Sequence, residues 1–237
     1  QVLEPFIILL SDKTYATFIF LGYFFIISDA PFVNGRVEQT LLRTNRRRWK
    51  NSIVLYMVTQ TALYYGFLLL VTVVPSIPRG YVGNVWSQSF YMLSKYGSNA
   101  MLHKYGVVVP EATFLSMGGP VSAAIHSVFL MFLYSFTLAM IVLVFSLGTS
   151  RLIGSICALG VHFVGYLIIS DSMFIPIKYS LLAHGVYYYH SGQMTAGAMS
   201  AVFSYCLFAF IIIVLMFILD RLVDYCDLRL SVSEKNI

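Results

Sequence analysis

A run of basic residues is the strongest candidate for chemistry in this sequence. Arg43, Arg46, Arg47, Arg48 and Lys50 lie close together beside Trp49. Such a run can attract the anionic headgroups of a lipid surface, and it can dock a soluble protein partner. The fifteen positions from 36 to 50 hold six basic residues, which is more than membrane orientation alone requires.

Other ionisable side chains are rare within the long apolar runs, where a bilayer would make them expensive to bury. Asp29 lies near the end of one run beside Pro31. It could pair with an arginine of the basic run and relay motion, or it could simply end a helix before Pro31. His126 and His162 lie inside two other runs, and neither has a carboxylate or a second histidine three or four positions later. This spacing favours a hydrogen bond to a neighbouring helix over a proton relay or a metal site.

The sequence contains no nucleotide-binding or catalytic signature. No G-x-x-x-x-G-K-[ST] motif is present, so this chain has no P-loop with which to cradle nucleotide phosphates. The three cysteines have no CxxC or Cys/His ligand spacing and are expected to be reduced, structural thiols. We therefore predict no catalytic residue, no metal site and no cofactor bound by this chain.

The composition of the chain indicates whether these residues lie in a soluble protein or in a membrane protein. The 237 residues are 59% hydrophobic and 11% charged, and their mean hydropathy is +0.80. Soluble domains have roughly 25% charged residues, so the sequence predicts an integral protein of the cell membrane. The net charge of +5 is then a signal of topology, and nucleic acid is not an expected partner.

Five stretches are long and apolar enough to cross a hydrocarbon core of roughly 30 Å. They are apolar on every face, which favours helices over the alternating strands of a barrel. We predict one all-α transmembrane domain over residues 1–237, a helical bundle with spans at about 13–33, 52–74, 120–148, 152–169 and 195–219.

Lysine and arginine are enriched in cytoplasmic loops, and this rule orients the bundle. If the first connection is cytoplasmic, ten basic residues lie inside and five outside. This orientation makes 34–51 and the tail 220–237 cytoplasmic, and it leaves the N-terminus outside. A further span before Gln1 would return the N-terminus to the cytoplasm and make six spans, which is a hypothesis about residues absent from this sequence.

The first cytoplasmic connection, 34–51, contains no helix breaker between Glu38 and Trp49. A short helix in the plane of the membrane surface is expected there. The alternative is a solvated loop that only holds topology.

Aromatic residues gather in the two external connections. The long one, 75–119, carries Trp86 and Phe90 at helical spacing, and short amphipathic helices on the outer surface would explain the pattern. The second carries Tyr187 and Tyr188. These four residues could form an external gate or contact a substrate, but packing against the ends of the spans is the favoured interpretation.

Small residues line the fourth span, where Gly154, Ala158, Gly160 and Gly165 would allow close helix approach. This span is expected to be central to the bundle or to form a dimer interface. The fifth span continues without a breaker through Asp220, so its helix is expected to extend beyond the membrane.

A succession of features along the chain resembles a known family. The segment Phe25-Ile26-Ile27-Ser28-Asp29-Ala30-Pro31-Phe32 is followed by a polar helix, the basic run and a tyrosine-rich span. This arrangement resembles the permease subunits of ABC-2 type transporters of Gram-positive bacteria, over the whole chain in helix order and loop length. In that family the cytoplasmic helix contacts an ATPase subunit. The resemblance implies that the docking residues here are Glu38, Arg43, Arg46, Arg47, Arg48 and Trp49, with Asp29 as a possible relay.

The sequence therefore predicts the transmembrane subunit of an ATP-driven exporter. Its expected partners are a separate ABC ATPase, which would bind ATP and Mg, and a second permease subunit, either identical or homologous. The alternative from another class is a membrane sensor or assembly subunit that binds a ligand through its external loop. The transported substrate is not predicted, although an aromatic outer rim mildly favours an amphipathic one.

Overall fold

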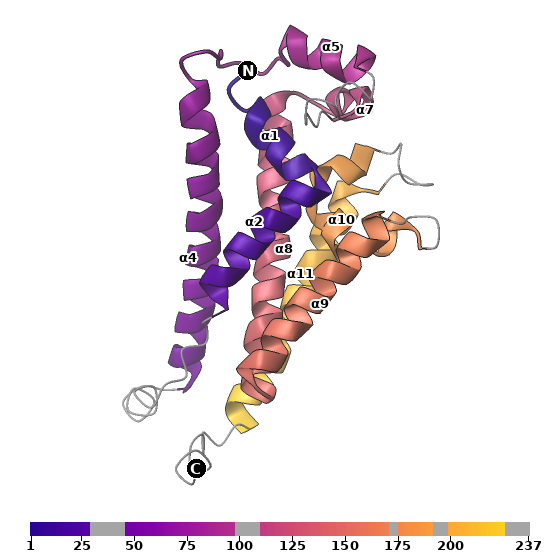
Figure 1. Ribbon diagram of the computed structural model, residues 1–237. Coiled ribbons are helices and arrows are strands. Elements are labelled where there is room, and N and C mark those ends of the chain that lie inside the picture. The colour runs from indigo at the N-terminus through magenta and orange to yellow at the C-terminus, as the bar shows by residue number, and fades with distance from the viewer. Residues whose placement is uncertain (29–45, 98–109, 171–174, 192–198, 226–237) are drawn as a thin grey trace.

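The computed structural model describes residues 1–28, 46–97, 110–170, 175–191 and 199–225 (Figure 1). Every regular element in these ranges is helical. Four long helices run roughly along one direction: α4 (Arg46–Val73), α8 (Pro120–Gly148), α9 (Arg151–Ser170) and α11 (Ala201–Tyr225). Each is long and apolar enough to cross a membrane.

Two shorter helices form a bent pair at the N-terminus. The axes of α1 (Glu4–Ser11) and α2 (Lys13–Ile27) differ by 89°, and together the two helices are long and apolar enough to form one broken span or a re-entrant loop. Asp12 explains the bend, because its extended backbone ends α1 while its carboxylate accepts from the backbone N–H groups of Thr14 (2.8 Å) and Tyr15 (3.1 Å). A side chain that caps the first turn of α2 also stops the preceding helix from continuing.

The predicted spans agree with these helices to different degrees. The predicted third span, 120–148, has the same bounds as α8, and the fourth, 152–169, differs from α9 by one residue at each end. The second begins at Arg46 and not at 52, because the basic residues continue the same helix. The fifth was placed too early, since α11 begins at Ala201, and its expected extension past Asp220 is confirmed. The prediction missed α1, and residues 29–33 of the first span lie outside the described part of the chain.

The centre of the bundle is α8. It packs against α1, α2, α4, α9, α10 (Leu181–Gly185) and α11, and its buried residues occur on all sides of the helix. By contrast, α4 lies at one side of the bundle (Figure 1) and buries a single stripe: Lys50, Met57, Thr61 and Tyr65. The fourth span was expected to be central to the bundle or to form a dimer interface. The described bundle is built around the third span, and the dimer interface stays a prediction.

Close packing of α9 on α8 depends on the predicted small residues. A methyl group built on Gly154 would lie 2.6 Å from the Val142 carbonyl oxygen of α8. Ala158 is fully buried on the same face, whereas Gly160 faces open space. Three of the four small residues therefore mark helix contacts, and Gly165 does so against Ser180 and Leu182 beside α10.

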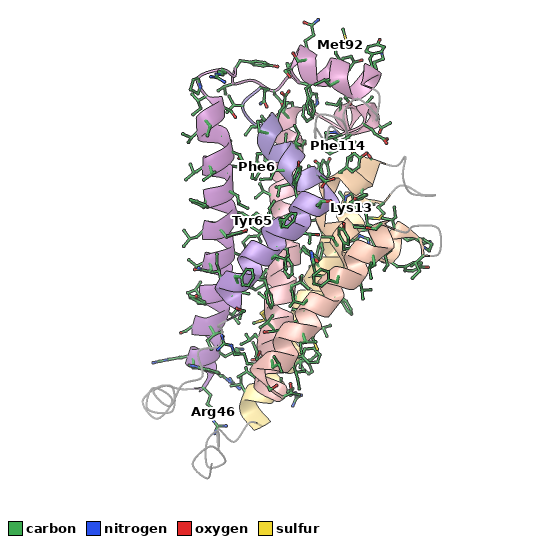
Figure 2. All side chains as sticks on the ribbon, viewed as in Figure 1. Phe6, Lys13, Arg46, Tyr65, Met92 and Phe114 are labelled. Atoms are coloured by element: carbon green, nitrogen blue, oxygen red, sulfur yellow. The ribbon has the colours of Figure 1, made fainter. Side chains whose placement is uncertain are left out.

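Short elements cover one end of the bundle: α5 (Gln88–Tyr96), α7 (Ala112–Ser116) and the 3-10 helices η1 (Val74–Ser76), η2 (Ile177–Tyr179) and η3 (Tyr187–Ser191). We call this the aromatic end, after Trp86, Phe90, Phe114 and Tyr187. The opposite end carries Arg46–Arg48, Lys50 and Arg151, and we call it the basic end. Figure 2 places Phe114 and Met92 toward the first and Arg46 at the second.

Candidate functional site

The described part of the basic run forms the first turn and a half of α4. Arg47 and Arg48 are exposed, while Trp49 packs against the apolar core. Arg46–Lys50 belong to the same continuous helix as the apolar part of α4. A molecule that binds these residues therefore contacts α4 directly. Glu38, Arg43 and Asp29 lie outside the described residues, as does most of the predicted surface helix 38–49.

Lys50 joins α4 to α11. Its ammonium group forms an ion pair and hydrogen bond with the carboxylate of Asp220. The Lys50 side chain is only 10% exposed, whereas the Asp220 side chain is 50% exposed. A buried cation without a partner would be costly, so this contact holds the basic end of α4 against α11. Arg151, at the start of α9, donates from Nε to the Ser28 carbonyl oxygen at 2.9 Å. Because Ser28 directly follows α2, this bond attaches the end of α2 to the start of α9.

Further along, α4 meets the bundle through tyrosine hydroxyls. Tyr23 of α2 and Thr61 of α4 share a hydrogen bond of 2.6 Å, and Tyr64 of α4 donates to the Ile19 carbonyl oxygen of α2 at 2.7 Å. Tyr65 of α4 bonds to Ser135 of α8 at 2.6 Å. Helix contacts in lipid gain little from apolar burial, so these polar contacts, with Lys50–Asp220, define how α4 sits on its neighbours.

The seam of buried polar groups continues through α8 to α9. The Tyr134 hydroxyl lies 2.7 Å from Nδ1 of His162, and the Phe20 ring stacks on the His162 ring with centroids 4.2 Å apart. His126 likewise contacts the Tyr205 hydroxyl of α11 at 2.6 Å. The expectation that these two histidines hydrogen-bond to neighbouring helices is confirmed.

The aromatic end is a packed cluster. Trp86 and Phe90 stack at 5.4 Å, and Phe114 contacts Tyr187 and Tyr188 at 5.8 Å each. Phe90 is 5% exposed and Tyr187 7% exposed. The structure thus brings the four candidate gate residues toward one cluster through Phe114, and their mutual contacts favour the packing interpretation. Burial, together with the charge of Glu111, raises the pKa of Tyr188 to about 12.

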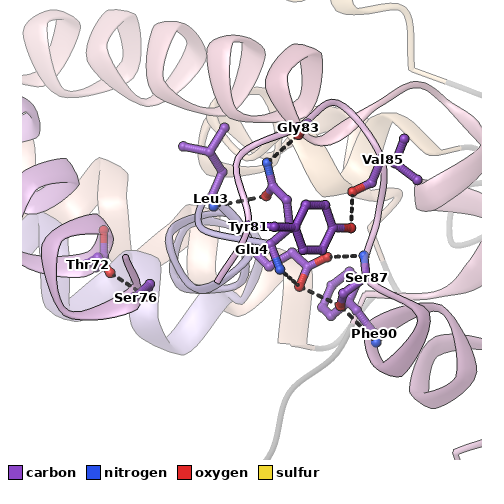
Figure 3. A network of polar contacts seen from close by, with 10 residues as sticks. Leu3, Glu4, Thr72, Ser76, Tyr81, Gly83, Val85, Ser87 and Phe90 are labelled. Carbon is purple, nitrogen blue, oxygen red and sulfur yellow. Dashed lines mark hydrogen bonds and ion pairs between the residues drawn. The ribbon is translucent and has the colours of Figure 1, made fainter. Parts of the chain in front are cut away.

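An acid on α1 holds α5 in place. The Glu4 carboxylate accepts from the Ser87 backbone N–H (2.6 Å) and from the Ser87 hydroxyl (2.8 Å), and the same hydroxyl accepts from the Phe90 N–H at the start of α5 (Figure 3). Gln1 donates from its side chain to the Gly83 carbonyl oxygen at 2.8 Å. These bonds tie the N-terminal segment to the long connection 75–119.

Sequence reasoning missed three sets of residues: the Glu4–Ser87 contact, the tyrosine seam and the Lys50–Asp220 pair. The Lys50–Asp220 contact joins positions 170 apart in the sequence, so no local spacing could reveal it. Tyr56, Tyr64 and Tyr65 make up the tyrosine-rich span of the sequence analysis. Their spacing did not predict the bonds that Tyr64 and Tyr65 make to other helices.

Comparisons of this chain with protein-family models, with curated proteins and with solved structures found no match.

Proposed function

We propose that this chain is the membrane-spanning permease subunit of an ATP-driven exporter of the ABC-2 type, with the basic end in the cytoplasm and the aromatic end outside. The observation that carries the proposal is the construction of α4. Exposed arginines begin this helix, and its buried stripe contacts α2, α8 and α11 through polar groups.

This construction suits mechanical coupling. A partner bound to Arg47 and Arg48 pushes on a rigid helix whose inward face combines apolar packing, as at Trp49 and Met57, with a few hydrogen bonds and one ion pair. Such polar contacts have two discrete states, made or broken, and packed interfaces of this kind convert small shifts into larger rearrangements. Movement of α4 would reach α8 through Tyr65–Ser135 and α11 through Lys50–Asp220.

The partner would supply the energy. An ABC ATPase binding ATP and Mg in its own P-loop would contact the basic end, and the residues of this chain that meet it would include Arg46–Arg48 and Trp49, with Glu38 and Arg43 from the preceding segment. A second permease subunit would complete the pathway.

Affinity purification tests the proposal. We expect an ATPase with a P-loop to copurify with the full chain from mild detergent, and the Arg46→Ala/Arg47→Ala/Arg48→Ala variant to lose it. The matched control removes three cations from the aromatic end, as Arg79→Ala/Lys95→Ala/Lys178→Ala, and should retain the ATPase. If no ATPase follows the unmodified chain, or if both triple variants lose it equally, the proposal fails.

Exchange of the ion pair tests coupling separately from docking. Asp220→Asn should leave the ATPase bound and lower substrate-stimulated ATP hydrolysis, because the arginines remain while the link to α11 is weakened. The swap Lys50→Asp/Asp220→Lys should restore part of the activity. Loss of binding in Asp220→Asn would instead mean that Asp220 belongs to the docking surface.

One observation favours a second candidate, a sensor or assembly subunit that binds a ligand at the aromatic end. Several apolar side chains there are exposed, including Val82 (90%), Val85 (69%) and Tyr96 (70%). Under this alternative, replacing Val82 and Tyr96 with serine would abolish ligand-dependent signalling, and the arginine variant would have no effect.

A further inference from the structure

Three polar side chains meet at the aromatic end, where α11 begins. The Ser204 hydroxyl oxygen of α11 lies 2.7 Å from Nδ1 of His184, in α10, and 2.8 Å from Nε2 of His190, in η3. All three residues are buried, with Ser204 fully so. Two imidazole rings therefore share one hydroxyl group inside the protein.

The second nitrogen of each ring faces a carbonyl oxygen. Nε2 of His184 lies 2.9 Å from the Lys178 carbonyl, and Nδ1 of His190 lies 3.2 Å from the Tyr187 carbonyl. A carbonyl oxygen only accepts, so both of these nitrogens must carry hydrogen. A neutral imidazole has one N–H, which means that in the neutral forms both nitrogens facing Ser204 are acceptors.

The hydrogens do not suffice for the contacts. Four contacts need four hydrogens, while two neutral imidazoles and one hydroxyl supply three in all. The Ser204 hydroxyl can donate to one histidine, and the other histidine then presents a lone pair to the lone pair of the same oxygen. The Ser200 carbonyl oxygen lies 3.4 Å from the Ser204 hydroxyl. It is a further acceptor for the same hydroxyl hydrogen, so the number of acceptors exceeds the number of hydrogens by still more.

We propose that His184, Ser204 and His190 form a proton-binding site at the aromatic end, which closes its full set of hydrogen bonds when one added proton is shared by the two rings. The proton makes one ring an imidazolium that donates to Ser204, and the Ser204 hydroxyl donates to the other ring. This inference is independent of the proposed transport function.

The surroundings set the pH range. Burial lowers the pKa of His184, although its bond to the Lys178 carbonyl acts in the opposite direction. Burial also lowers the pKa of His190, to about 4. The carbonyls of Tyr187 and Val186 act in the opposite direction, while positive charge on His184 and His126 lowers this pKa further. The site therefore holds no added proton at neutral pH and binds one on acidification below the ordinary histidine pKa of about 6.5.

Several other titratable groups surround the site. They are His126 of α8, Lys178 and Tyr179 of η2, Tyr187, Tyr188 and Tyr189 of η3, Tyr205 of α11, Tyr166 of α9, and Asp12 and Glu111 near the η3 tyrosines.

A second proton is disfavoured, because two imidazolium rings would then face one oxygen atom. The two rings consequently titrate as a coupled pair, whose apparent pKa values belong to the pair and not to either ring. Stacking of Tyr187 on His126 (centroids 4.9 Å apart) and on His190 (5.9 Å) connects the site to α8. Proton uptake therefore alters how α10, η3 and α11 are held at this end.

Nitrogen-15 NMR of the histidine rings in the full chain, in micelles and between pH 8 and 3.5, tests the proposal. Above pH 7 we expect His184 as the Nε2–H tautomer and His190 as the Nδ1–H tautomer, assigned by the loss of signals in His184→Asn and His190→Gln. On acidification the pair should take up its first proton at least about one pH unit above its second. Either ring in the opposite tautomer above pH 7, or two rings titrating independently, would overturn the proposal.

Substitutions separate the shared hydroxyl from general effects of burial. Ser204→Ala should narrow the separation between the two steps, because only the direct repulsion between the rings remains. Ser191→Ala, which removes a serine of η3 whose hydroxyl donates to the Tyr188 carbonyl, should leave the separation unchanged. His190→Gln places an amide N–H donor toward Ser204 and closes the network without an added proton. In that variant His184 should stay neutral at a pH where the unmodified pair has bound its first proton. A separation in Ser204→Ala as large as in the unmodified chain would contradict the shared site.

Discussion

At the scale of single residues, polar atoms buried among apolar helices carry much of the specificity of this bundle. Tyr134 and Tyr65 are both fully buried on or against α8, and each hydroxyl meets one partner on another helix. Their partners, His162 and Ser135, differ in the hydrogen bonds that they can still make if the tyrosine hydroxyl is removed. Within the described residues, Nε2 of His162 has no hydrogen-bond partner, so Tyr134 provides the one bond that its ring makes there.

Removal of these two hydroxyls should therefore have unequal effects. Tyr134→Phe leaves the His162 ring without that bond and should lower the free energy of unfolding by about 0.6 to 1.7 kcal/mol, the average and the largest value for hydrogen bonds between membrane helices. Tyr65→Phe should cost less, because Ser135 can turn its hydroxyl to a carbonyl of its own helix. Reversible unfolding in mixed micelles measures both, and an equal or larger loss in Tyr65→Phe would contradict this account.

At the scale of elements, the approach of α9 to α8 is limited by the size of one side chain. Gly154→Ala introduces a methyl group within 2.6 Å of the Val142 carbonyl oxygen and 2.4 Å of the Ser146 hydroxyl oxygen. The serine can turn away, but the backbone carbonyl cannot, so the two helices must separate. We expect a loss of about 1–3 kcal/mol in the free energy of unfolding, as for other overpacked cores.

The same helix offers a matched control. Gly160→Ala meets no atom within 4 Å and should be neutral or stabilise α9 by up to about 1 kcal/mol through helix propensity. Thermal unfolding of the two variants in the same detergent gives the comparison. If both substitutions shift the melting temperature alike, helix propensity and not packing decides the effect.

Attachment of α5 to α1 is a second property of elements. Glu4→Gln keeps the size of the side chain, but it removes the negative charge that accepts from the Ser87 N–H and hydroxyl. Hydrogen bonds to a charged acceptor are roughly twice as strong as neutral ones. Amide hydrogens of Gln88–Tyr96 should exchange faster in this variant, while those of α8 should not change, and hydrogen-exchange mass spectrometry can follow both. Unchanged exchange in α5 would mean that its other contacts, such as the Trp86–Phe90 stacking and the Ser94 bond to the Pro110 carbonyl, hold it without the Glu4 charge.

At the scale of the whole molecule, the run of arginines and the aromatic cluster lie at opposite ends. Arg47, Arg48 and Arg151 lie at the basic end, and the aromatic cluster covers the other. Lysine and arginine enrichment on the cytoplasmic side predicts how this asymmetry aligns with the membrane.

Accessibility labelling in intact cells tests that orientation. In a chain whose native cysteines are replaced, Lys95→Cys should react with a membrane-impermeant maleimide, whereas Arg48→Cys should react only after the membrane is permeabilised. Both positions are exposed, so a difference reports sidedness and not burial. The reverse pattern would invert the topology and would also remove the proposed cytoplasmic docking surface.

The sequence by itself determined the long helices of this protein and the different character of its two ends. Hydropathy averaged over about 20 residues is a local property, and for this reason the bounds of α8 and α9 were predicted to within one residue. Three of the four small residues of α9 were likewise predicted correctly as contact positions, because small side chains let helices approach closely in lipid. Gly160, which faces open space, is the exception.

Only the tertiary structure decided how the helices pair. It placed α8 at the centre of the bundle and set the bend at Asp12. It also brought together residues of different elements in three contacts: Lys50–Asp220, Tyr134–His162 and His184–Ser204–His190. A helix that is apolar on every side gives no periodic signal of which face will be covered. The buried polar groups therefore found their partners through the fold, because the pairing of distant helices depends on the complementary shape and hydrogen bonding of both surfaces at once.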